Sequence, residues 1–373
     1  MPKMPDRKPI TFEDVMAFHA HEQPIMLRIA SGMSFANMNL AGIRFIECDL
    51  TGCDFSGATL TDAQIVSCTL KGARFNGCNL KNTQIVSCDM DASEMRDTYV
   101  ERAQIVAGNA SNCNFSGSTF DQVSFAQPDL MDADFSKASF YRAVVLASDV
   151  TGASFANAVL SNFMLTDADL RPVDITGTFI DIAVFADANL SGLDLSGQSW
   201  QHCTFHKGEF KGTNLNGANL SASVFAECDF EGASLRGVTA NTTGFTKSKL
   251  DGVDLSGSQL TMANFAGAGL SGARFNSSQL FSAVFQEADC RAALFEQCDL
   301  RQVEFSHADL SGASLSASNF NLTKFHAAKT EQTVMLGTSG SRIETDTDRA
   351  IAELYRPDKV ALDGDGAGQG GTL

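Results

Sequence analysis

A five-residue rhythm runs through most of this 373-residue chain and limits what the chain can fold into. From Phe35 to Phe325, every position whose number is a multiple of five is apolar, 59 of 59. A small residue usually lies two positions before each of these, as in the segment Gly212–Phe230. An α-helix would repeat about every 3.6 residues and a β-strand about every 2, so neither template fits. Self-similarity at a short fixed period is typical of a solenoid.

A second, longer period spans four of these pentapeptides. The segment QIVSC occurs at Gln64–Cys68 and again at Gln84–Cys88, and QIVAG follows at Gln104–Gly108. Copies at this constant spacing are what equivalent positions of stacked coils would show. Single repeats such as GANLS at Gly217–Ser221 and ADLSG at Ala308–Gly312 match the pattern A-(D/N)-(L/F)-x-x. The chain therefore resembles the pentapeptide-repeat family.

The resemblance implies an all-β fold, namely a right-handed quadrilateral parallel β-helix with four pentapeptides in each coil. We expect nearly 15 coils, with short helices near the two ends of the chain. The predicted organisation is an N-terminal segment with a capping helix over 1–24 and the β-helix over 25–335. A short helix and a disordered, Gly-rich tail are predicted over 336–373.

The positions of the charged residues indicate which registers face inward. Between Met33 and Ala327, none of the acidic or basic residues lies at a multiple of five or two positions before it. Burying an unpaired charge costs several kcal/mol, so both registers must face the interior. All ten cysteines occupy these registers too, which predicts buried, free thiols. Cys48, Cys68 and Cys88 should stack one coil apart, and a disulfide between two of them is the alternative.

The N-terminal segment predicts a cover for the first coil. Thr11 is followed by Asp14 three residues later, a variant of the helix capping box, and Val15 and Met16 lie on the apolar face that follows. A helix over 10–24 would shield the unpaired edge of the stack. The chain starts without the apolar stretch of a signal peptide, and no apolar run approaches the roughly 20 residues that span a bilayer. We therefore expect a cytoplasmic protein without membrane association.

No group of residues in the sequence predicts catalysis, and we expect neither an enzyme nor a metal or cofactor site. His202, Cys203 and His206 have nearly the spacing of zinc ligands, but the cysteine faces inward and the histidines face outward. His307 and Asp309 fall on a flat wall that offers no pocket for a nucleophile and its base.

Negative charge gathers on one flank of the predicted tube. When residue numbers are divided by 20, the arc from remainder 7 to remainder 14 holds 24 acidic and nine basic residues, whereas the rest of the coil is nearly neutral. The main contributor is the row at remainder 9, with these residues near its centre: Asp129, Asp149, Asp169, Glu209 and Asp229. The family's preference for Asp or Asn before the bulky residue, together with solubility, is one explanation.

The acidic flank also allows a functional interpretation through the family resemblance. Some pentapeptide-repeat proteins protect DNA gyrase by resembling duplex DNA, so a DNA mimic that binds gyrase or another topoisomerase is one hypothesis. Direct binding of nucleic acid is not expected, because an acidic surface repels phosphate.

An apolar strip marks the neighbouring side, centred on remainder 5. Its outward positions and their extension onto the next side include Val144, Leu146, Val159, Met164, Phe179 and Val184. A contiguous apolar surface often marks an interface, although β-propensity alone also favours valine in a ladder. We predict that the segment 144–184 contacts a protein partner or a second copy of the chain.

The sequence thus favours a non-enzymatic protein-interaction scaffold or adaptor built on a rigid rod. The DNA-mimic hypothesis is the main alternative. A third is an adaptor or effector of a bacterial secretion system, which rests on the family resemblance alone.

Overall fold

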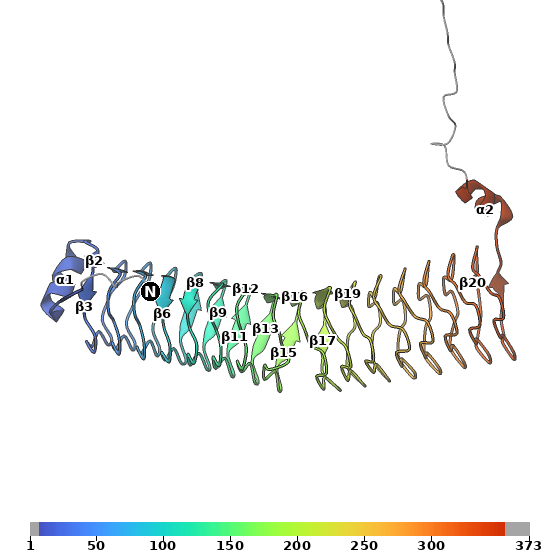
Figure 1. Cartoon of the computed structure of the whole chain (residues 1–373), viewed down its shortest axis with the longest axis horizontal. Coiled ribbons are helices and arrows are strands. Elements are labelled where there is room, and N and C mark those ends of the chain that lie inside the picture. The colour runs from blue at the N-terminus through green and yellow to red at the C-terminus, as the bar shows by residue number, and fades with distance from the viewer. Residues whose placement is uncertain (1–6, 355–373) are drawn as a thin grey trace, which may run out of the picture.

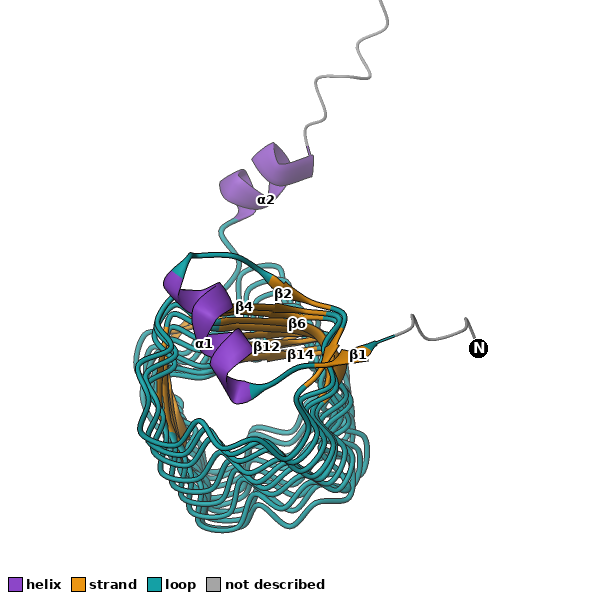
Figure 2. Ribbon diagram, turned by 90° about the vertical axis from the view of Figure 1, so that its left-hand side faces the viewer, coloured by secondary structure: helices purple, strands orange, loops and turns teal. Residues whose placement is uncertain are grey.

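The protein forms a long, four-sided tube with a short helix near each end (Figure 1; Figure 2). The structure is a computed structural model and describes residues 7–354. Ladder pairs join residues that are 20 apart, except at the last coil, where the step is 19. The predicted coil of four pentapeptides is therefore confirmed. The parallel β-solenoid has about 17 turns, somewhat more than expected, because its ladder runs from Lys8 to Ile343.

Two neighbouring sides of the tube carry continuous parallel sheets (Figure 2). The long-sheet face has eleven strands: β2 (Ile25–Met26), β4 (Arg44–Ile46), β5 (Gln64–Val66), β6 (Gln84–Asp89), β8 (Gln104–Asn109), β10 (Ser124–Ala126), β12 (Val144–Leu146), β14 (Met164–Thr166), β16 (Val184–Ala186), β18 (Thr204–His206) and β19 (Val224–Ala226). The short-sheet face has six: β7 (Tyr99–Glu101), β9 (Thr119–Asp121), β11 (Ser139–Tyr141), β13 (Val159–Ser161), β15 (Phe179–Asp181) and β17 (Trp200–Gln201). The other two sides are held mainly by isolated bridges between coils.

Short elements complete the two ends. They are β1 (Lys8–Pro9), which pairs with β3 (Arg28–Ile29), β20 (Thr323–Lys324), which pairs with β21 (Arg342–Ile343), and the helices α1 (Phe12–Ala20) and α2 (Thr347–Leu354).

Helix α1 begins at the predicted cap and covers the first coil. The Thr11 hydroxyl accepts the backbone N–H of Asp14 at 3.1 Å, and the Asp14 carboxylate accepts the backbone N–H of Thr11. Val15 is fully buried, and the ring of Phe12 stacks on that of Phe35 with centroids 5.9 Å apart. The helix therefore shields apolar surface that the open end of a solenoid would expose.

The core is a continuous column of side chains from the two inward registers. Leu215 and Phe225 are each 1% exposed, and from Phe35 to Phe325 the bulky register is buried except at Ile175, which is half-buried. From Phe185 to Phe325 the phenylalanines one coil apart stack with ring centroids 4.9–5.5 Å apart. All ten cysteines are buried and free. Within residues 7–354, neither helix has the length and apolar character that a bilayer span requires.

Most corners of the tube place the residue two positions after a bulky one in the left-handed region, as at Gly77 (φ 65°) and Asn82 (φ 55°). Such a residue also donates its backbone N–H to the next coil, as Asp132 does to Thr151 at 2.8 Å. Pro172 occupies this position, but the proline ring fixes φ at about −65° and leaves no N–H. It can make neither the turn nor the bond.

The ladder is interrupted on both sides of Pro172. Bridges connect Asp129 with Asp149, and Asp169 with Asn189, but within residues 7–354 no bridge connects Asp149 with Asp169. On the adjacent side, no bridge of the described chain connects Asp174 with Asp194. Pro128 does not interrupt the ladder, because its neighbour Asp129 still donates its backbone N–H to the carbonyl of Gly108 at 3.0 Å.

These gaps lie on the two sides opposite the continuous sheets. Figure 1 shows the tube bent in this region, near β15 and β17, with the strands of the long-sheet face on the concave side. When successive coils stay bridged on one side of a tube and lose their bridges on the opposite side, the unbridged side becomes longer and the tube bends. The rod is therefore curved around the segment that carries the predicted apolar strip.

Candidate interaction surface

Three apolar side chains stack on the outside of the long-sheet face. Val144, Met164 and Val184 are partners in the ladder of β12, β14 and β16. Each is half-buried and is followed in its strand by a fully buried residue. Since side chains alternate along a strand, the three point outward together. Leu146 ends the first of these strands, is also half-buried, and pairs with Thr166.

The short-sheet face continues the apolar surface. Val159 on β13 pairs with Phe179 on β15, and Phe179 is 57% exposed. Between Phe179 and Val184 the chain turns the corner at Ile182, which is 48% exposed. These residues, with Val144, Leu146 and Met164, form a surface that we call the concave patch. It brings together all six apolar residues singled out in the sequence and adds Ile182.

Polar pairs border the concave patch at the same corner of the tube. One coil before it, both carboxylate oxygens of Asp121 accept hydrogen bonds from Arg142 at 2.6 and 2.8 Å. One coil after it, Asp181 lies 3.0 Å from Nδ1 of His202. An apolar centre with a polar, solvated rim is the composition of protein interfaces.

The acidic row forms one column on the side next to the long-sheet face. Asp129 and Asp149 are bridged, and so are Glu209 and Asp229, but the gap beside Pro172 separates Asp149 from Asp169. The four aspartates share a local role, since each accepts the backbone N–H two residues later at 2.9–3.1 Å. They close the corner as Asx turns. Hydrogen bonds from the side chain and the backbone N–H of Thr151 lower the pKa of Asp149 below its ordinary value.

Cations neutralise part of this column. Arg171 contacts the carboxylate of Asp169 at 2.6 Å. Asp229 lies between Lys249 at 3.0 Å and Lys211 at 3.5 Å. Corner geometry thus accounts for aspartate at these positions, and the exposed negative charge is less than the row of acids suggests.

A family model covers more than half of the chain and decides its classification. The model described as pentapeptide repeats matches in eight copies over residues 31–64, 60–97, 111–144, 183–221, 209–239, 245–276 and 283–321. The chain belongs to the pentapeptide-repeat family. The matched segments leave out 145–182, which holds most of the concave patch and Pro172. The family model of this pentapeptide-repeat protein is thus interrupted over most of the concave patch.

Several solved structures are similar to this pentapeptide-repeat protein. HetL, involved in heterocyst differentiation regulation in the cyanobacterium Nostoc sp. strain PCC 7120, is 18% identical over 74% of this chain and 97% of its own, with a TM-score of 0.18. Full-length QnrB1, a plasmid-mediated fluoroquinolone resistance protein, is 17% identical over 45% and 96%, with a TM-score of 0.24. A pentapeptide-repeat protein of the Arabidopsis thaliana thylakoid lumen is 24% identical over 31% and 74%, with a TM-score of 0.18. None of the curated proteins compared matches the chain.

The structure separates the residues whose spacing resembles a metal or catalytic motif. His202 pairs with Asp181 on the surface, whereas Cys203 is fully buried. Asp309 pairs with Lys329 at 3.3 Å and not with His307.

Two features of this pentapeptide-repeat protein are absent from the sequence predictions. One is Ile182, whose signal is a β-branched residue at a corner position where glycine is common. The other is a cluster in which His307 and His326 both contact Glu353 of α2 at 3.1 Å. The repeat places the two histidines on neighbouring coils. Helix α2 lies beyond the repeat, so the sequence period could not predict the position of Glu353.

Proposed function

We propose that this pentapeptide-repeat protein is a non-enzymatic scaffold that holds a protein partner in the concave patch. The observation that carries the proposal is the exposure of Phe179 and Ile182, at 57% and 48%, beside the outward-facing Met164 and Val184. Exposed aromatic and aliphatic side chains within a polar rim are what binding hot spots are made of. Removing them from water on binding contributes roughly 1.5–3 kcal/mol for each side chain that becomes fully buried.

The shape and charge of the surface favour a partner other than a second copy. The patch continues around the corner at Ile182 onto a second face, so a partner must contact two faces of the tube, and a second copy would bring the same net negative charge toward the first. The chain has a formal net charge of −17, so a partner with basic residues around an apolar anchor fits best.

The interior of the tube is tightly packed behind the concave patch. The apolar space among Phe163, Ile175 and Trp200 has a volume of only about 10 Å³, whereas pockets for small molecules measure roughly 300–1,000 Å³. The DNA-mimic hypothesis is supported less well than the scaffold, because the aspartates of the column serve corner turns and several are paired with cations.

Partner capture from the native host tests the proposal. Met164→Asp and Val184→Lys place charges at the centre of the patch and should each reduce the captured partner at least tenfold. The matched control is Met262→Asp, because Met262 is 57% exposed and occupies the same corner column as Ile182, four coils further on. It should leave capture unchanged.

Three results would contradict the scaffold proposal. They are equal capture by the patch variants and the wild type, a dimer that Met164→Asp dissolves, and inhibition of gyrase supercoiling that charge reversal in the acidic column abolishes. The second result would assign the patch to a second copy, and the third would favour the DNA mimic.

A further inference from the structure

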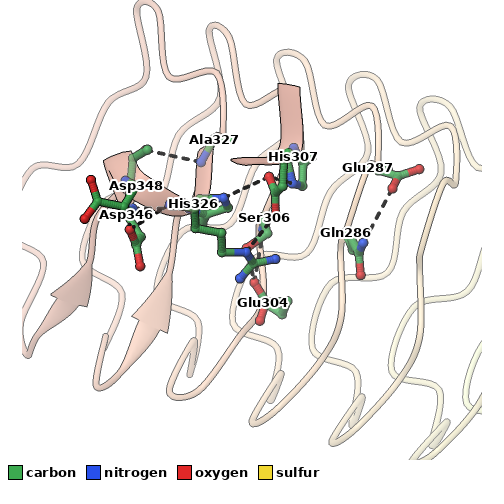
Figure 3. A network of polar contacts seen from close by, with 12 residues as sticks. Gln286, Glu287, Glu304, Ser306, His307, His326, Ala327, Asp346 and Asp348 are labelled. Carbon is green, nitrogen blue, oxygen red and sulfur yellow. Dashed lines mark hydrogen bonds and ion pairs between the residues drawn. The ribbon is translucent and has the colours of Figure 1, made fainter. Parts of the chain in front are cut away.

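A cluster of nitrogen and oxygen donors lies where α2 meets the side of the tube. His307 and His326 occupy neighbouring coils (Figure 3), and Glu353 reaches them from α2. Oε2 of Glu353 is 3.1 Å from Nε2 of each histidine. One ligand atom from each of the three residues lies within 4.8 Å of the other two.

The surroundings hold this cluster in place. The side chain of His326 is only 5% exposed, while those of His307 and Glu353 are each 33% exposed. The other carboxylate oxygen of Glu353 accepts a hydrogen bond from Nε of Arg349 at 2.7 Å. Arg349 thus holds one carboxylate oxygen of Glu353, while the other oxygen stays directed at the two histidines.

We propose that His307, His326 and Glu353 bind a divalent transition-metal ion, with Zn²⁺ as the best fit. Two imidazoles and one carboxylate are a ligand set that zinc prefers, with bond lengths of about 2.0–2.2 Å. An ion at that distance from all three ligands separates them by about 3.3 Å in a tetrahedral arrangement. The carboxylate oxygen of Glu353 lies 3.1 Å from each histidine nitrogen, and the ligand atoms of the two histidines lie within 4.8 Å of one another. The side chains of His307 and Glu353 are partly exposed, so a water molecule would complete the tetrahedral set.

Binding of a metal ion requires one hydrogen bond of His326 to break. Nδ1 of His326 accepts the backbone N–H of Asp346 at 3.2 Å, so the ring proton lies on Nε2 and points at Glu353. A metal ion on Nε2 requires the proton to move to Nδ1, and the Asp346 amide must then turn away. Asp346 also accepts the backbone N–H groups of Asp348 and Arg349 at the start of α2. Metal binding is therefore coupled to the first turn of α2.

Titration of the full chain, produced without a histidine tag and freed of metal by a chelator, tests the site. Calorimetry with ZnCl₂ should show one ion per chain. Co²⁺ should give the visible absorption bands of a four-coordinate site. Because replacing the buried His326 risks the fold, the decisive variants are His307→Ala and Glu353→Gln at partly exposed positions. Each should weaken Zn²⁺ binding at least tenfold.

The control is His202→Ala, since His202 is a surface histidine beside a single carboxylate. It should change the affinity less than twofold. The proposal is overturned if the wild type shows no saturable binding. It is equally overturned if His307→Ala and Glu353→Gln bind as tightly as the control, because the ion would then occupy another part of the chain.

Discussion

Single hydroxyl and thiol groups in the small register tie successive coils together from the inside. The Thr83 hydroxyl donates to the carbonyl of Leu60 at 2.8 Å, and the Ser223 hydroxyl donates to that of Trp200 at 2.7 Å, in both cases 23 residues back along the chain. A buried hydroxyl must have such a partner, because an unsatisfied polar group in the interior costs free energy. The small register therefore accepts Ser, Thr and Cys as readily as Ala.

Replacing one of these hydroxyls should destabilise the stack. The Ser223 hydroxyl also accepts the backbone N–H of Cys203 at 3.0 Å, so Ser223→Ala leaves two buried groups without partners. We expect the free energy of unfolding to fall by about 1–3 kcal/mol, measured by urea denaturation. The exposed residue Ser196 provides the control, and Ser196→Ala should change stability by less than about 0.5 kcal/mol. Equal effects of the two substitutions would contradict the role of the hydroxyl.

The buried thiols predict loss of stability at alkaline pH. Burial raises the pKa of Cys53 and Cys78 from 9.0 to about 12. Between these pH values the folded thiols keep protons that the unfolded chain releases. Their contribution to stability is therefore complete below pH 9 and is lost as the pH rises toward 12. The double variant Cys53→Ala/Cys78→Ala should lose stability less steeply over this range in urea denaturation, and parallel curves would refute the assignment.

At the scale of elements, the backbone at the corner between β15 and β16 is strained. Ile182 has a φ of 53°, a conformation that costs an L-residue roughly 1–2 kcal/mol and is rarest for β-branched side chains. Its side chain is also exposed, so no burial compensates for this strain.

Ile182→Gly separates stability from binding. Glycine adopts the left-handed conformation without strain, so the variant should unfold at the same denaturant concentration as the wild type or a higher one. Loss of the exposed side chain should nevertheless weaken partner capture severalfold. A variant that loses stability and keeps its partner would show that Ile182 serves the fold and not the interface.

At the scale of the whole molecule, most of the fold could be predicted from the five-residue period, which determines the side chains that face inward. Phe225 and Cys203 were assigned to the interior because the period fixes which side chains face inward, and both are buried. The gap beside Pro172 also has a signal in the sequence, since proline lacks the N–H donor that the corner needs. The bend could not be predicted, because it depends on which two sides of the tube lose their bridges together. Glu353 could not be placed either, since it follows the last repeat.

The bend also gives the rod a direction. The long-sheet face lies on its concave side (Figure 1), and the missing bridge between Asp174 and Asp194 lies on the opposite side of the tube. The bend places the outward side chains of β12, β14 and β16 on the concave side, while Val159 and Phe179 lie on the adjoining short-sheet face. The proposed scaffold thus depends on Pro172 for shape and on Phe179, Ile182 and Met164 for contact.

Site-specific photo-cross-linking in the native host tests this account most directly. A benzoylphenylalanine in place of Phe179 should form an adduct with one other protein, and the same group in place of Met262 should not. Adducts of equal yield and identity from both positions, an adduct between two copies of the chain, or no adduct from position 179 would contradict a partner held in the concave patch.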